Sequence, residues 1–187
     1  MLEYFSRYWW AVALRGALAV VFGVVAWIWP DITVRALVLL FGFYALVDGL
    51  LALAALVVGG QLVRDRRGWL LVEGIAGIAA GIVSFVWPGI TTLVLLYLIA
   101  AWAIATGVLE VVVAVWLRRE LRGEWLLALV GVLSVLFGVF LVLRPSEGAV
   151  AVVWALGLYA LVFGVALIAL GLRLRQLGRR LGGAAPA

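Results

Sequence analysis

The chain contains no cysteine and no histidine. The absence of cysteine excludes disulfide bonds, thiol nucleophiles and thiolate metal sites. The absence of histidine removes the side chain that most often serves as a general base or metal ligand near neutral pH. Neither Ser-His-Asp chemistry nor a histidine-based metal centre can be assembled, so we expect no enzyme activity, no catalytic residues, no cofactor and no metal site.

Charged side chains are also scarce, at 12% of residues, whereas 68% are hydrophobic and the mean hydropathy is +1.30. A soluble domain is about half apolar and about a quarter charged. This chain has too little polar surface to cover a water-soluble globule, so the lipid bilayer must be its solvent. Its basic excess consists entirely of arginine. In a membrane protein such an excess usually sets topology, and we expect no nucleic-acid partner.

The apolar residues form six long runs. They are 10–29, 32–58, 69–87, 90–117, 125–143 and 149–172. At about 1.5 Å of rise per residue, each run is long enough as a helix to cross a hydrocarbon core of about 30 Å. We therefore predict an all-α polytopic membrane protein with six transmembrane helices.

Three prolines, Pro30, Pro88 and Pro145, separate the runs in pairs. Proline lacks an amide proton and its ring clashes with the preceding helical turn, so each proline ends a helix. Proline is tolerated in the first turn of a following helix, where we expect Asp31 or Thr33 to cap free amides. Each proline therefore marks a tight turn between two spans.

The proline turns belong to an internal repeat with an offset of 57 or 58 residues. Other small residues keep the same offset, and a tryptophan (Trp10, Trp69 or Trp125) opens the first span of each repeat. The repeated sets are Gly16, Gly74 and Gly131; Gly23, Gly81 and Gly138; Gly42, Ala100 and Gly157; and Gly49, Gly107 and Gly164. We infer three helical hairpins, at about 9–58, 69–117 and 125–172. A basic tail over 173–187 follows, and we expect its Gly/Ala-rich end to be disordered.

Each repeat contains an even number of spans, so the three hairpins point the same way across the membrane. Such parallel repeats are related by rotation about the membrane normal. We predict a single membrane domain over 1–187 with a pseudo-threefold axis. Small residues let transmembrane helices approach closely, and the nine repeated glycines, those of the three sets with glycine in every repeat, are therefore assigned to helix packing.

Arginines are distributed unevenly among the connections between spans. Eleven lie in the N-terminal segment, the two linkers between repeats and the tail, whereas the proline turns hold Arg35 and Arg144. The positive-inside rule places the linkers and both termini in the cytoplasm. The same arginines could bind anionic lipid headgroups. The remaining outward helix surface would allow a homo-oligomer, whose size the sequence does not define.

The repeated motifs resemble those of a known family. They are Gly16 and Gly23 after the opening tryptophan, the turn Pro30-Asp31-Ile32-Thr33, Asp48-Gly49, and their counterparts in the second repeat. Over nearly its whole length the chain is similar to the HdeD family of bacterial inner-membrane proteins, also described as a short DUF308 repeat family. The third repeat departs, with Arg144 before its proline and Gly148 where the others have threonine. The resemblance implies a stress-response protein associated with acid resistance, and it supplies no catalytic residues.

Four ionisable residues fall inside the predicted spans: Arg15, Asp48, Glu73 and Glu110. Such residues are costly in a bilayer and mark functional sites by default. Arg15 and Glu73 share one repeat position, about 6–8 Å from the cytoplasmic boundary, and arginine can extend to the interface from there. Asp48 and Glu110 lie about 10–15 Å deep, so their short side chains must be protonated, paired or hydrated.

One arginine cannot neutralise three carboxylates. We predict a polar cluster in the cytoplasmic half of the bilayer, in which Arg15 pairs with Glu73 or Asp48. The cluster is either a structural clasp between the first two repeats or a proton-sensing or proton-conducting site. We therefore expect a non-enzymatic, stress-associated membrane protein, and the alternative is a small proton- or ion-linked transporter or channel.

Overall fold

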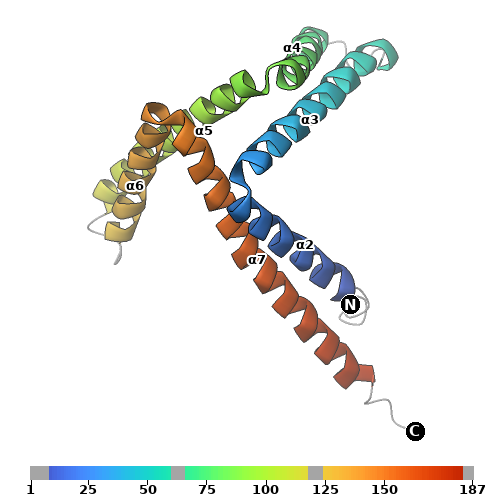
Figure 1. Cartoon of the computed structure of the whole chain (residues 1–187), viewed down its shortest axis with the longest axis vertical. Helices are drawn as coiled ribbons and strands as arrows, with labels where there is room; N and C mark the ends of the chain where they lie inside the picture. The colour runs from blue at the N-terminus through green and yellow to red at the C-terminus, as the bar shows by residue number, and fades with distance from the viewer. Residues whose placement is uncertain (1–8, 60–65, 118–123, 183–187) are drawn as a thin grey trace. The chain divides into compact units, whose positions relative to one another are not determined.

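The computed structural model describes residues 9–59, 66–117 and 124–182, and in this part of the chain every regular element is a helix. The six long helices are α2 (Trp9–Ile28), α3 (Pro30–Val58), α4 (Arg67–Val86), α5 (Pro88–Leu117), α6 (Glu124–Leu143) and α7 (Pro145–Gly182) (Figure 1). All six are long and apolar enough to cross a membrane. The chain is an all-α, six-span membrane protein, as its composition and apolar runs predict.

Each proline is the first residue of the second helix in its hairpin. An N–H in the first helical turn has no partner within the helix, so a proline, which lacks that N–H, loses no hydrogen bond there. A single residue separates the two helices and forms a backbone hydrogen bond with each of them. The Trp29 amide donates to the Val25 carbonyl at 2.8 Å, and the Trp29 carbonyl accepts from the Thr33 amide at 3.1 Å. Trp87 and Arg144 make the same two bonds in the other turns. The second helices therefore begin two to four residues before their predicted starts at Ile32, Ile90 and Ala149.

The predicted capping role is wrong for Thr33. Its hydroxyl donates to the Trp29 carbonyl at 3.0 Å, so it satisfies a carbonyl of the turn and no free amide. Such a bond to the residue four positions earlier is a common alternative for threonine within helices. Asp31 is exposed in the first turn of α3, where a carboxylate interacts favourably with the helix dipole.

Helix α7 continues beyond the last apolar run. The run ends at Leu172, whereas the helix reaches Gly182 and includes the basic part of the tail. Residues 183–187, the rest of the Gly/Ala-rich end, lie outside the described residues. The extension packs on the first turns of α2: the Arg175 guanidinium carbon lies 4.7 Å from the ring centroid of Trp9.

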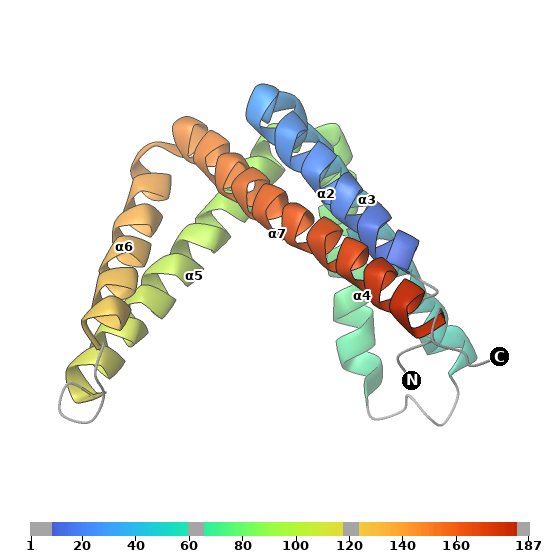
Figure 2. The ribbon, with the colours of Figure 1, turned by 90° about the horizontal axis from the view of Figure 1, so that it is seen from below.

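The closest helix contacts join neighbouring repeats. Helix α3 packs against α4, α5 against α6, and α2 against α7 (Figures 1 and 2). Helix α5 contacts α6 far more extensively than α4, the other helix of its own hairpin. The first helix of the second and third repeats thus packs on the second helix of the preceding repeat, and α2 packs on α7.

These interfaces fall into two compact units. One unit, 34–149, holds the α3·α4 and α5·α6 interfaces, and the other is built from both ends of the chain and holds the α2·α7 interface. Each unit is described by itself, and the pseudo-threefold axis stays a prediction.

All nine repeated glycines are buried at these interfaces. A Cβ atom at Gly16 would lie 2.7 Å from the Gly164 carbonyl oxygen, and one at Gly107 would lie 2.6 Å from the Gly131 carbonyl oxygen. Real Cβ atoms essentially never show distances this short, and backbone atoms cannot move aside as a flexible side chain can. Lipid gives helices no hydrophobic reason to associate, so this close packing supplies the attraction.

One set of fully buried side chains lies near the proline turns. Ala26, Ser84 and Leu141 occupy the same repeat position, and each is 0% exposed. Two further repeat-related sets are also buried: Thr33 with Thr91, and Val38 with Leu96 and Val153. The Ser84 hydroxyl donates to the Ala80 carbonyl at 2.7 Å, so its burial leaves no unpaired hydroxyl donor. The four ionisable residues assigned to the span interiors, Arg15, Asp48, Glu73 and Glu110, lie farther along the helices, away from these turns.

Candidate functional site

The ionisable residues inside the spans border the helix interfaces. Arg15 precedes Gly16 and is exposed, whereas Asp48, Glu73 and Glu110 are half-buried. Their positions follow the interface glycines, because each lies one or three residues away from a glycine that contacts the facing helix. The sequence thus places polar side chains beside the closest backbone contacts.

Asp48 and Glu73 lie at the same interface. Asp48 precedes Gly49 on α3, Glu73 precedes Gly74 on α4, and the two glycines contact each other across the antiparallel pair. Successive helical residues are about 100° apart. In an antiparallel pair, the residues that precede two facing glycines therefore fall on the same side of the interface. The structure brings these two carboxyls to one side of the α3·α4 contact.

Glu110 belongs to the α5·α6 interface, three residues after Gly107. Its Oε2 atom is fully enclosed and has no hydrogen-bond partner. The facing helix α6 has no ionisable side chain between Trp125 and Leu143. Glu110 is therefore the carboxyl with the least polar surroundings among the three.

The predicted pairing of Arg15 stays a prediction. Arg15 lies in the unit formed by α2 and α7, whereas Asp48, Glu73 and Glu110 lie in the other unit. Among the described residues, an ion pair forms at the third proline turn, where Arg144 Nη1 lies 3.3 Å from Glu147 Oε1.

The Arg144–Glu147 ion pair was not predicted, and neither were three further contacts between polar side chains or between helices. Ser146 Oγ donates to Glu147 Oε2 at 2.9 Å beside the Arg144 ion pair. The other two hold α2 to α7: Trp27 stacks on Trp154 with centroids 5.7 Å apart, and Arg175 lies over Trp9. The three-residue spacing of Arg144 and Glu147 was a usable signal. The α2·α7 contacts join distant segments and had no local signal.

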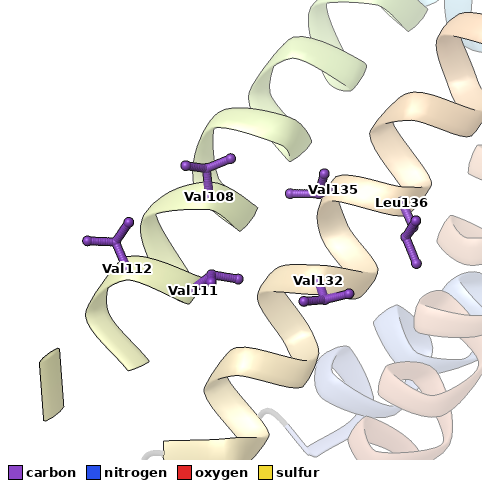
Figure 3. Close-up of a pocket in the computed structure, with 6 residues that line it drawn as sticks. All are labelled: Val108, Val111, Val112, Val132, Val135 and Leu136. Carbon is purple, nitrogen blue, oxygen red and sulfur yellow. The ribbon is translucent and has the colours of Figure 1, made fainter. Parts of the chain in front are cut away.

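The grooves found on α5 and α6 have no charged lining. One groove of about 300 Å³ lies between the two helices, and Figure 3 shows its aliphatic walls. Its residues are Val108, Val111, Val112, Val132, Val135 and Leu136. A second groove on α5 includes Trp102 and Ala105. Within the described ranges, no three acidic side chains stand close enough to hold a metal ion. These surfaces suit lipid chains or other helices.

The basic linkers are only partly described. Arg66 and Arg67 are exposed at the start of α4. Arg64, Arg118, Arg119 and Arg122 lie outside the described residues, so lipid binding by the linkers stays a prediction.

Comparison with known proteins adds one finding. A family model described as "Short repeat of unknown function (DUF308)" matches residues 14–85, 72–143 and 129–184. No curated protein and no solved structure matches the chain.

The matched ranges follow the interfaces. The first contains α3 and all but the last residue of α4, and the second contains both α5 and α6. The third ends with α7, whose partner α2 lies at the other end of the chain. The matches cover nearly the whole sequence, and the chain belongs to the DUF308 short-repeat family.

Proposed function

We propose that the chain is a non-enzymatic protein of the bacterial inner membrane that contributes to survival under stress, and under acid stress in particular. The motifs shared with the HdeD family support this role. The observation that carries it is the placement of carboxyl groups beside glycine interfaces inside the spans, where protonation can alter helix packing. In this proposal the linkers and both termini face the cytoplasm.

The α3·α4 interface is the proposed acid-responsive element. Asp48 and Glu73 share one side of this contact, and two like charges near each other in a medium of low dielectric constant repel strongly. Protonation of either carboxyl removes the repulsion and tightens the interface. A membrane protein that packs more firmly as protons enter the cytoplasm would keep its integrity when unprotected proteins fail.

The test is survival of a deletion strain after an acid shock, with plasmid-borne variants compared at equal membrane levels. We expect the wild-type gene to restore survival. The double variant Asp48→Asn, Glu73→Gln should give a survival different from that of the wild type. Leu40→Val, a change at an exposed position of α3, is the matched control. Equal survival with and without the wild-type gene would contradict the acid-stress role.

The alternative is a small proton- or ion-linked transporter or channel. The enclosed, unpartnered oxygen of Glu110 favours it, because intramembrane carboxyls form proton relays in pumps and transporters. Proton flux into liposomes containing the purified protein discriminates the two. Flux above that of empty liposomes, lost in Glu110→Gln, would replace the first proposal with this one.

A further inference from the structure

Glu110 differs from the other carboxyls of the spans in one atom. Its Oε2 is fully enclosed and accepts no hydrogen bond, whereas Asp48 and Glu73 have no such enclosed oxygen. The side chain as a whole is half-buried, so part of it is exposed at the surface of its unit.

The two helices that form the interface at Glu110 supply no countercharge over Pro88–Leu117 and Trp125–Leu143. Helix α5 has no other charged residue between Pro88 and Leu117, and its tyrosine, Tyr97, lies more than three turns away. Helix α6 has no ionisable residue between Trp125 and Leu143. Helix α4, which also contacts α5, has Glu73 and, at its start, Arg67.

The repeat provides an internal comparison for this position. Its counterparts are Ala52, which is 8% exposed, and Leu167, which is half-buried. The same interface, built three times, therefore accepts two apolar side chains and one glutamate. A side chain that shares such a position is accommodated most readily in an uncharged form, because an isolated charge in an apolar site costs far more than a neutral polar group.

We propose that Glu110 is a proton-binding site: its carboxyl carries a proton in the bilayer and is reached from the lipid by hydrophobic carboxyl reagents. The assignment goes beyond the proposed stress role because it concerns the chemical state of one side chain. It does not depend on whether the protein affects survival under acid stress. It also separates Glu110 from the Asp48 and Glu73 pair, which faces another helix interface.

Dicyclohexylcarbodiimide is a suitable probe because it partitions into lipid and consumes the acid proton. That proton passes to one carbodiimide nitrogen, and the carboxyl oxygen adds to the central carbon to form an O-acylisourea. Transfer of the acyl group to nitrogen then gives a stable N-acylurea. The sequence is an addition followed by a rearrangement, so no group leaves and no further reactant is needed.

The first measurement is the infrared spectrum of the purified full-length protein in lipid near neutral pH. We expect the wild-type minus Glu110→Gln difference to show the carbonyl stretch of a protonated acid. The wild-type minus Asp48→Asn difference spectrum should lack a band at the frequency found for Glu110. A carboxylate stretch in its place for Glu110 would overturn the proposal.

The second measurement is carbodiimide labelling followed by mass spectrometry. We expect one adduct on the α5 peptide of the wild type, an undiminished adduct in Asp48→Asn and Glu73→Gln, and at least a tenfold loss in Glu110→Gln. Glu110→Leu, which copies the residue of the third repeat, should also lose the adduct while folding normally. Failure to label the wild type, or equal labelling of Glu110→Gln, would overturn the proposed access from lipid.

Discussion

The α3·α4 and α2·α7 interfaces use the same glycine contacts, yet they differ in what surrounds these contacts. Gly49 and Gly74 are 25 residues apart in the sequence, whereas Gly16 and Gly164 are 148 apart. The α3·α4 interface has two carboxyls on one side. The α2·α7 interface has a stacked tryptophan pair near the proline turn and a cation–π contact near the chain termini. The repeated glycines set how closely the helices approach at both interfaces, whereas the carboxyl and aromatic residues around them differ from one interface to the other.

The α2·α7 interface must bring together two segments that are far apart in the chain. Loop-closure entropy costs about 0.6 kcal/mol for each doubling of the closed length, so closing the longer segment costs about 1.5 kcal/mol more. A stacked aromatic pair contributes about 0.5–1.5 kcal/mol, and an exposed cation–π contact about 0.5–1 kcal/mol. The extra contacts are therefore of the size required to offset the added entropy. The α3·α4 interface, closed by a short linker, can accommodate unfavourable charges in the same place.

The largest expected effect comes from Gly49→Ala. A Cβ atom there would lie 2.7 Å from the Ile78 nitrogen and 2.8 Å from the Gly74 carbonyl oxygen. Backbone atoms of α4 can yield only if the helices separate, and overpacking costs about 1–3 kcal/mol or more. We expect a loss of free energy of unfolding in that range, measured by reversible unfolding in bicelles.

Gly68→Ala is the matched control for that change. Gly68 lies in the first turn of α4, and a Cβ atom there would meet nothing within 4 Å. Alanine favours helix over glycine by up to about 1 kcal/mol, so we expect this variant to be unchanged or slightly more stable. Equal destabilisation by the two substitutions would show that the glycine contacts do not set the interface.

Tryptophan stacking should couple α2 to α7 by a smaller amount. Trp27 and Trp154 stack with an interplanar angle of 20°. Their repeat counterparts, Phe85 with Leu39 and Tyr97 with Val142, combine one aromatic and one aliphatic side chain, so no ring stack can form there. A double-mutant cycle with Trp27→Leu and Trp154→Leu should give a coupling free energy of about 0.5–1.5 kcal/mol. Strict additivity of the two substitutions would remove the closure role assigned to the stack.

The comparison also shows which features could be predicted. Six apolar runs and the constant spacing of Gly16, Gly74 and Gly131 were sufficient to predict six spans and three repeats. The helix starts at the prolines were missed because the apolar run, and not the first hydrogen-bonded turn, was taken as the boundary. The end of α7 was missed for the same reason, since arginine and glutamine continue a helix as readily as leucine.

Helix partners were harder to predict. Adjacency in the sequence favours contacts within a hairpin, whereas Gly16 contacts Gly164 at the far end of the chain. Glycine spacing identifies the contact face but not the facing helix. In the candidate site, the neighbourhood of Asp48 and Glu73 follows once Gly49 is known to face Gly74. The enclosed oxygen of Glu110 depends on its rotamer and on α6 packing, so no spacing rule could reveal it.

The smallest expected effect tests the cation–π contact that distinguishes α2·α7. Arg175→Gln removes the charge 4.7 Å from the Trp9 ring and should lower the free energy of unfolding by about 0.5–1 kcal/mol. Arg175→Lys keeps a cation and should retain part of that stability. Arg173→Gln, an exposed change two residues away on α7, controls for net charge. If Arg173→Gln destabilises the protein as much as Arg175→Gln, the effect comes from charge near the membrane surface, and the aromatic ring has no part in closing the chain.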